Sequence, residues 1–324
     1  MVPKEPDEVW QVLVINKGGK MGRSFWFEWE VQLMQWLQSA LGGKFVTVAD
    51  IITNMGEGVF LVAIIGLIYW GFDKEFGKYV GNLVVVGAVW NPMVKNLILR
   101  RRPYMDHAGI KCLKAVDSEY DIMDLSGQGY SFPSGHSTNS ILCFASLPTY
   151  LRNKYLVMLG IVMPLLIGFS RVYLGVHYPT DVIGGWLLGL VILLVVGNLQ
   201  AVVKKRWHLN LIIFLISLVG LFYCRSADYY TSLGLMAGFY LAQEFEDKFI
   251  HFDNTSNIIK IILRVAGGIG LFLLLNILSK MPFSEKFLES ATFSAYIVRF
   301  IRYFVVSFIV LGVYPFVFSK NRVK

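Results

Sequence analysis

Long apolar runs, separated by short polar connections, dominate the chain. They lie at residues 53–71, 79–99, 136–151, 155–174, 180–199, 209–224, 228–243, 258–279 and 294–318. A membrane-spanning helix needs about 20 mainly apolar residues, so the pattern predicts roughly nine spans. We therefore expect an all-α, polytopic integral membrane helix bundle.

The stretch at residues 26–41 follows a different pattern. It is rich in aromatic residues but short, and it contains Glu28 and Glu30. This combination is typical of an interfacial or re-entrant helix that lies at the membrane surface. The residues before it are polar and carry Lys4, Lys17, Lys20 and Arg23 without an apolar centre, so we expect no cleavable signal peptide.

The pattern predicts three regions along the chain. Residues 1–45 form a tail and an amphipathic interfacial helix, and residues 46–200 form a six-segment core that carries the three motifs described below. Residues 201–324 add further C-terminal transmembrane helices.

Composition supports the membrane class and changes little else. Of the 324 residues 55% are hydrophobic, 15% are aromatic and only 16% are charged, which is too apolar for an ordinary soluble domain. The net charge of +8 comes from basic residues beside apolar runs, a pattern of membrane topology signals, so we expect no nucleic-acid partner. The cysteines Cys112, Cys143 and Cys224 are odd in number and imply no disulfide framework.

Basic residues in short connections predict the orientation. If all runs cross, one side carries Lys74, Lys78, Arg152, Lys154, Lys204, Lys205, Arg206, Lys320, Arg322 and Lys324. Such residues resist translocation, so that side is predicted to be cytoplasmic. The long acidic connection between Arg102 and Tyr130 then lies on the other side of the cell membrane. The side of the N-terminus depends on whether residues 26–41 cross.

The first candidate motif is Lys95-x6-Arg102-Pro103, at the end of an apolar run. Seven residues are two helical turns, or about 10 Å of rise, so both cations can reach one pocket if the helix loosens before Pro103. A lysine inside an apolar run is a site hypothesis by default. The alternative is a snorkelling lysine with topology-setting arginines, and we assign Arg100 and Arg101 to that alternative.

The second motif is Pro133-Ser134-Gly135-His136, which opens an apolar helix. Ser134 is a suitable N-cap, and the free N–H groups of Gly135 and His136 can bind an anion. The alternative is a capped helix start with an incidental histidine. His136 favours the anion site, because a histidine near a phosphate can protonate a leaving oxygen.

The third motif, Ser170-Arg171-x5-His177-x3-Asp181, lies between two strongly apolar runs. Pro179 suits the first turn of a helix, which places Asp181 in that turn and His177 just before it. An aspartate that accepts from one imidazole nitrogen leaves the other nitrogen free as a nucleophile or base. Arg171 offers a planar cation for an oxyanion such as phosphate. The alternative is a capping aspartate with an interfacial histidine and arginine.

Together the three motifs resemble the complete motif set of the type 2 phosphatidic acid phosphatase superfamily, the membrane lipid phosphatases related in core fold to vanadium haloperoxidases. The likeness covers residues 50–200, and residue types, spacing and order all agree. It implies that His177 attacks phosphorus to form a phosphohistidine, that Asp181 holds His177, and that His136 is the acid for the leaving group. It also implies a phosphate-binding set of Lys95, Arg102, Ser134, Gly135 and Arg171.

A metal site made of His136, His177 and Asp181 is the chemical alternative, since two histidines and a carboxylate can bind zinc or iron. The cations of Lys95, Arg102 and Arg171 would repel a metal ion. We therefore expect no metal and no other cofactor.

The predicted function is hydrolysis of a lipid phosphate or lipid diphosphate on the extracytoplasmic side of the cell membrane. Candidates are undecaprenyl pyrophosphate, phosphatidic acid, phosphatidylglycerol phosphate and a sphingoid phosphate; the lipid and the oligomeric state stay open. A non-hydrolytic lipid-phosphate carrier or scramblase is the alternative. The presence of both His177 and His136 argues against it, because a binding protein needs neither a nucleophile nor an acid.

Overall fold

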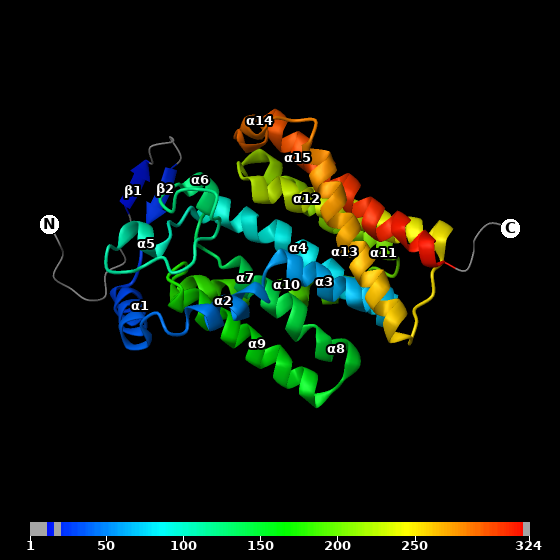
Figure 1. The fold of residues 1–324 in the computed structure, drawn as a ribbon, viewed down its shortest axis with the longest axis horizontal. Coiled ribbons are helices and arrows are strands. Elements are labelled where there is room, and N and C mark those ends of the chain that lie inside the picture. The colour runs from blue at the N-terminus through cyan, green and yellow to red at the C-terminus, as the bar shows by residue number, and fades with distance from the viewer. Residues whose placement is uncertain (1–11, 16–20, 320–324) are drawn as a thin grey trace. The chain divides into compact units, whose positions relative to one another are not determined.

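A computed structural model describes residues 12–15 and 21–319 of the chain (Figure 1). The described residues are mostly helical, as predicted, with one antiparallel pair of strands, β1 (Val12–Ile15) and β2 (Met21–Ser24). Three of the predicted topology signals, Lys320, Arg322 and Lys324, lie outside the described residues, as do Lys4, Lys17 and Lys20 of the polar N-terminal stretch. The helices form two compact units, Met1–Glu57 with Met93–Val191 and Gly58–Pro92 with Ile192–Lys324.

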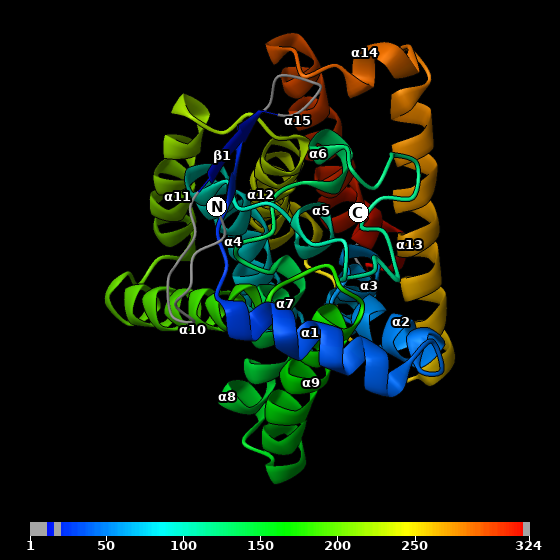
Figure 2. The same cartoon turned by 90° about the vertical axis from the view of Figure 1, so that its left-hand side faces the viewer.

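The first unit contains all three motifs. Its helices are α1 (Glu28–Leu41), α2 (Val46–Asn54), the last residues of α4 (Lys74–Ile98), α5 (Pro103–Asp106), α6 (Leu125–Gln128), α7 (Gly135–Ser140), η2 (Ile141–Ala145), α8 (Leu147–Leu151), α9 (Lys154–Tyr173) and the first half of α10 (Pro179–Val202). Helices α2, α7, α8 and η2 pack on α9. Within this unit α1 lies at the end where α9 finishes, and α8 lies at the opposite end (Figures 1 and 2).

Helix α1 is amphipathic, as predicted for residues 26–41. It begins after Phe27, whose backbone N–H donates to the Glu30 carboxylate at 3.0 Å. Trp29, Leu33 and Trp36 are exposed, whereas Val31, Met34 and Leu37 are buried against a cluster that includes Tyr178. Its 14 residues rise about 21 Å, less than the roughly 30 Å of a bilayer core. A place at the membrane interface stays a prediction.

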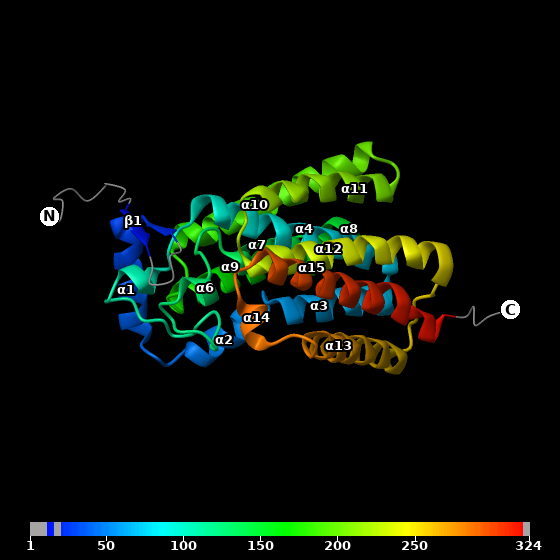
Figure 3. The same cartoon turned by 90° about the horizontal axis from the view of Figure 1, so that it is seen from above.

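The second unit is a bundle of longer helices. It contains α3 (Gly58–Gly66), η1 (Leu67–Phe72), α4 up to Pro92, α10 from Ile192, α11 (Arg206–Ser217), η3 (Leu218–Phe222), α12 (Ala227–Phe245), η4 (Glu246–Ile250), α13 (Ile258–Lys280), α14 (Glu285–Glu289), α15 (Phe293–Phe308), η5 (Ile309–Val313) and η6 (Tyr314–Phe318). Helix α12 packs along α15, and α13 packs on η1 and α15 (Figure 3).

A network of ion pairs joins α4, α11 and η4 within this second unit. The buried Lys78 ammonium lies 2.8 Å from Glu246 and 2.5 Å from Asp247, and Lys74 lies 2.9 Å from Glu246. Arg206 bridges Asp247, at 2.5 Å, and Glu75, at 2.7 Å. Lys74, Lys78 and Arg206, which the sequence marks as topology signals, therefore also hold the ends of these helices together.

Fewer helices are long and apolar enough to span a membrane than the nine runs predicted. Among residues 12–15 and 21–319, four helices are long and apolar enough to cross, namely α9, α10, α13 and the Phe293–Phe318 helix. A fifth span is counted if α2 with α3–η1 forms one span. The run at 136–151 is divided into α7, η2 and α8, and α11 with η3 is shorter than 18 residues. Continuous hydropathy along the sequence does not reveal such breaks, because they depend on local backbone geometry.

Candidate active site

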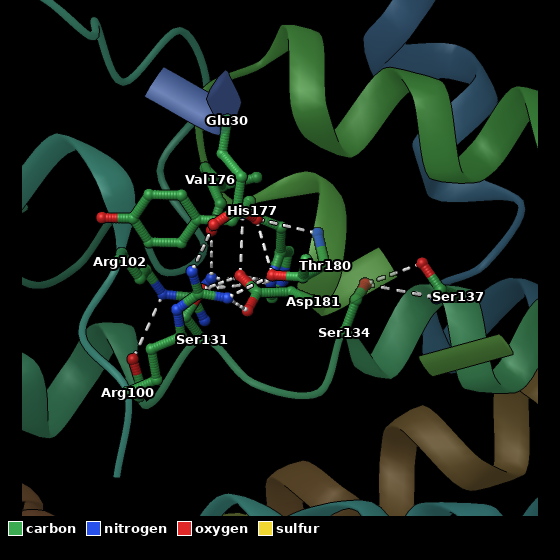
Figure 4. Close-up of polar contacts among 12 residues, drawn as sticks. Glu30, Arg100, Arg102, Ser131, Ser134, Ser137, Val176, His177, Thr180 and Asp181 are labelled. Atoms are coloured by element: carbon green, nitrogen blue, oxygen red, sulfur yellow. Dashed lines mark hydrogen bonds and ion pairs between the residues drawn. The ribbon is translucent and has the colours of Figure 1, made fainter. Parts of the chain in front are cut away.

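The third motif forms the centre of the site. Helix α9 ends at Tyr173 and α10 begins at Pro179, so His177 lies in the connecting loop and Asp181 in the first turn of α10, as predicted. Gly175 turns this loop with φ +80°, and a Cβ atom there would collide with the Lys111 carbonyl oxygen. His177 Nδ1 faces Asp181 Oδ2 at 3.5 Å, and both side chains are buried (Figure 4).

Each ring nitrogen of His177 faces a different group. The Ser131 hydroxyl lies 3.4 Å from Nδ1 and also donates to Asp181, whereas Nη1 of Arg102 lies 3.3 Å from Nε2. Burial, and then the cations of Arg102 and Arg171, hold the pKa of His177 well below its usual value. A neutral imidazole with its lone pair available is therefore favoured at neutral pH.

The first motif bends as predicted. Helix α4 ends at Ile98, and Leu99 follows in the left-handed region with φ 61°. The next residues run extended beside β2, where Arg101 N–H donates to the Arg23 carbonyl at 3.0 Å. This break brings Arg102 into the site, where its guanidinium also donates to the carbonyls of Gln128, at 2.6 Å, and Val176, at 2.9 Å. Lys95 is half-buried in the last turn of α4.

The second motif caps α7. The Ser134 side chain accepts from the Ser137 backbone N–H at 3.3 Å, as predicted for an N-cap, and Ser134 N–H donates to the Asp181 carbonyl at 2.9 Å. Gly135 and His136 are the first residues of α7 and are half-buried. The backbone bond between Ser134 and Asp181 fixes the second motif against the third.

Arg171 lies in the last turn of α9 and points toward α2. Its Nη1 donates to Thr53 Oγ1 at 3.0 Å, and its buried Nε has no hydrogen-bond partner within the described part of the chain. The residue after Thr53, Asn54, accepts from the Lys114 ammonium at 2.6 Å. Sequence analysis had singled out neither Thr53 nor Lys114.

Arg100 and Glu30 are further site residues that the sequence analysis missed. Arg100 was assigned to topology, yet its buried guanidinium contacts Asp181 at 2.6 Å and Glu30 at 2.8 Å. Two features of the sequence indicate that Arg100 and Glu30 have buried partners. Arg100 and Arg102 lie two apart in an extended segment and so share a side, and Glu30 shares the buried helical face of Met34 and Leu37, where a carboxylate needs a partner.

The structure thus places the residues of all three motifs in one unit. Arg102, His177 and Asp181 are in direct contact, and Ser134 is bonded to Asp181 through the backbone. Lys95, Gly135, His136 and Arg171 lie on the surrounding helices, and their phosphate-binding or catalytic roles stay predictions. In the described part of the chain, no group of three His, Cys, Asp or Glu side chains is arranged to hold a metal ion.

Comparison with known proteins shows the family of this chain. The model of the PAP2 superfamily matches residues 76–207, and that of the PAP2 superfamily phosphatase transmembrane extension matches residues 230–324. A phosphatidylglycerophosphatase B of Bacillus subtilis is 30% identical over 183 residues, which cover 52% of this chain and 78% of that protein. The chain belongs to the PAP2 superfamily.

Other relatives match shorter stretches. An undecaprenyl-diphosphatase of Bacillus subtilis is 29% identical over 135 residues, which cover 40% of this chain and 63% of that protein. A lipid A 4'-phosphatase of Porphyromonas gingivalis is 32% identical over 92 residues, or 28% of this chain and 39% of that protein. No solved structure matches the chain.

The PAP2 assignment fixes the class of the protein. It is a multi-pass membrane lipid phosphatase, an enzyme that hydrolyses phosphoric esters in a membrane environment. The matched residues, 76–207, span all three motifs, from Lys95 to Asp181. The division at residues 45 and 200 stays a prediction.

Proposed function

We propose that this PAP2 enzyme hydrolyses a lipid phosphate or diphosphate through a phosphohistidine at His177. The observation that carries the proposal is the orientation of the His177 ring: Nδ1 faces Asp181, and Nε2 faces the Arg102 cation. A proton on Nδ1, held by the carboxylate, leaves the Nε2 lone pair free to attack phosphorus. In this proposal Arg102, whose Nη1 faces that nitrogen, binds an oxygen of the phosphoryl group.

The reaction has two displacement steps. The Nε2 lone pair forms a bond to phosphorus as the bond to the leaving oxygen breaks, which is the lipid oxygen of a monophosphate or the bridging oxygen of a diphosphate, and His136 in its protonated form gives that oxygen a proton. Water then attacks phosphorus, the P–N bond breaks, and His136 takes a proton from the water. The side chains of Lys95, Arg102 and Arg171, with the Ser134–Gly135 helix start, neutralise charge on the phosphoryl oxygens.

The lipid belongs to the proposal as well. The relatives act, by their names, on phosphatidylglycerophosphate, undecaprenyl diphosphate and lipid A. We propose the substrate from the set of undecaprenyl pyrophosphate, phosphatidic acid, phosphatidylglycerol phosphate and a sphingoid phosphate. Basic residues in the alternating connections support an active site on the extracytoplasmic face.

Phosphate release from this set by the detergent-solubilised protein tests the proposal. Wild type should release phosphate from at least one lipid, His177→Ala and His136→Ala should not, and His208→Ala, outside the site, should match wild type. With substrate labelled at phosphorus, an alkaline quench should retain label on wild type but not on His177→Ala. Binding of a lipid phosphate without release by wild type would instead favour the carrier.

A further inference from the structure

Arg100 bridges two buried carboxylates. Its Nη1 donates to Asp181 Oδ1 at 2.6 Å, and its Nη2 donates to Glu30 Oε2 at 2.8 Å. Its Nε donates to the Phe25 carbonyl at 2.9 Å, and the guanidinium stacks on the Tyr178 ring at 3.9 Å. Figure 4 shows Glu30 and Asp181 on either side of Arg100. These contacts leave the guanidinium little freedom to move.

Glu30 also holds the residue next to Asp181. Its Oε1 accepts from the Thr180 backbone N–H at 3.0 Å and from the Thr180 hydroxyl at 2.6 Å. The Thr180 hydroxyl in turn accepts from Arg100 at 2.7 Å. One fully buried carboxylate from α1 therefore fixes both Arg100 and the first turn of α10.

The charges along this chain of contacts have a consequence for His177. Arg100 alone would cancel the charge of Asp181, the carboxylate that faces the imidazole. With Glu30 included, the two carboxylates and one guanidinium carry one net negative charge. The imidazole becomes cationic when Nε2 bonds to phosphorus with a proton on Nδ1, and a nearby negative charge stabilises that state.

We propose that Glu30 and Arg100 are positioning residues of the active site, which act on His177 through Asp181 and make α1 part of the catalytic unit. The inference rests on the proposed function, since it requires His177 to be the nucleophile. Neither residue needs to touch the lipid phosphate. Their removal should therefore slow the chemical step more than it weakens substrate binding.

The matched pair of variants is Glu30→Gln and Glu28→Gln. Both lie on α1 and remove one carboxylate charge without changing side-chain size, but Glu28 is exposed and Glu30 is buried against Arg100 and Thr180. We expect Glu30→Gln to lower kcat by about 10- to 100-fold, the size of effect seen when a group that orients a metal-ligating side chain is lost, with KM changed less than about threefold. Glu28→Gln should match wild type.

The pH profile of kcat/KM gives a readout that a merely structural role would not move. Loss of a negative charge lowers the affinity of His177 for a proton, so the acid limb of Glu30→Gln should shift to lower pH than that of wild type. The titratable or charged groups that face His177 are Lys95, Arg102, His136, Arg171 and Asp181. None of them changes in this variant, so the shift reports the loss of Glu30.

Folding and chemistry are separated by two further variants. Glu30→Asp keeps the charge on a shorter side chain and should recover part of the lost kcat. If Glu30→Gln does not elute as a single species in detergent, Arg100→Lys replaces it, and we expect the same loss of kcat.

The outcomes distinguish this proposal from the proposed function. The positioning role is overturned if folded Glu30→Gln has the kcat and the acid limb of wild type while His177→Ala is inactive in the same assay. Where Arg100→Lys replaces Glu30→Gln, a wild-type kcat in folded Arg100→Lys overturns it under the same condition. Activity in His177→Ala would overturn the phosphohistidine mechanism itself. Equal losses of kcat in Glu28→Gln and Glu30→Gln would assign the effect to α1 as a whole and would also overturn the proposal.

Discussion

Replacement of Glu246 by glutamine should destabilise the second unit strongly. The Glu246 carboxylate is fully buried and accepts from both Lys74, at 2.9 Å, and Lys78, at 2.8 Å. Glutamine keeps the shape but removes the charge, so the buried Lys78 ammonium loses its most buried partner. Loss of one partner from a buried ion pair costs roughly 3–5 kcal/mol.

The structure indicates where in that range the loss of unfolding free energy lies. Lys78 keeps the half-buried Asp247, and Lys74 is partly exposed to solvent, so the lower end applies, about 3 kcal/mol. For a chain of this length each kcal/mol moves the unfolding midpoint by about 2 °C, which gives a drop of about 6 °C. The exposed Glu244, two residues earlier at the end of α12, is the matched control, and Glu244→Gln should leave the midpoint within about 1 °C.

Thermal unfolding of the purified variants in one detergent, followed by tryptophan fluorescence, measures both shifts. High salt should not remove the difference between the variants, because a buried pair is screened little. A midpoint for Glu246→Gln equal to that of Glu244→Gln would refute the argument that a buried, charged network holds α4 to η4.

Four further predictions concern the site. Arg171→Lys should lower kcat/KM by about tenfold or more, or about 1.4 kcal/mol, because an ammonium cannot both keep the Thr53 contact and bind phosphate with a planar fork. Equal kcat/KM in the variant and in wild type would place Arg171 outside the pocket. Because the pKa of folded His177 is lowered, the acid limb of kcat/KM should lie below about pH 6.5, the ordinary pKa of histidine, and a limb above pH 7 would contradict this. The free energy of unfolding should also decrease as pH falls below about 6.5, because the imidazole of the unfolded chain takes up its proton first. EDTA should leave activity intact and vanadate should inhibit, whereas loss in EDTA with recovery on adding a divalent ion would favour a metal site. In intact cells a membrane-impermeant thiol reagent should label Cys112 and not a cysteine introduced at Asn153, and the reverse pattern would place the site on the cytoplasmic face.

Local signals in the sequence were sufficient for the parts of the site that depend on one segment. Pro179 marks the start of α10, Ser134 caps α7, and the chain leaves the helix before Pro103. Each of these features depends on neighbouring residues and the backbone geometry they allow. The contact between His177 and Asp181 follows from the same local geometry.

Contacts between distant segments were not predictable in the same way. Arg100 and Glu30 are 70 residues apart, and Arg100 stands in a run of three arginines that looks the same whether it sets topology or binds a carboxylate. Thr53 and Arg171 are 118 residues apart, and hydroxyl groups occur throughout the chain. Only the fold shows which of many possible partners is near.

The order in which the catalytic unit is synthesised has a consequence for its assembly. Glu30 and Arg100 leave the ribosome before Asp181, which follows Arg100 by 81 residues, or roughly 4–16 s at about 5–20 residues per second. Of the two buried carboxylates that contact Arg100 among the described residues, Glu30 alone has been made during that interval, and residues 58–92, which belong to the other unit, have also been made. We therefore expect chains arrested on the ribosome to protect α1 from protease only after Asp181 has emerged. Protection of α1 in a chain arrested at residue 160 would show that the α1–Arg100 pair folds before the rest of its unit.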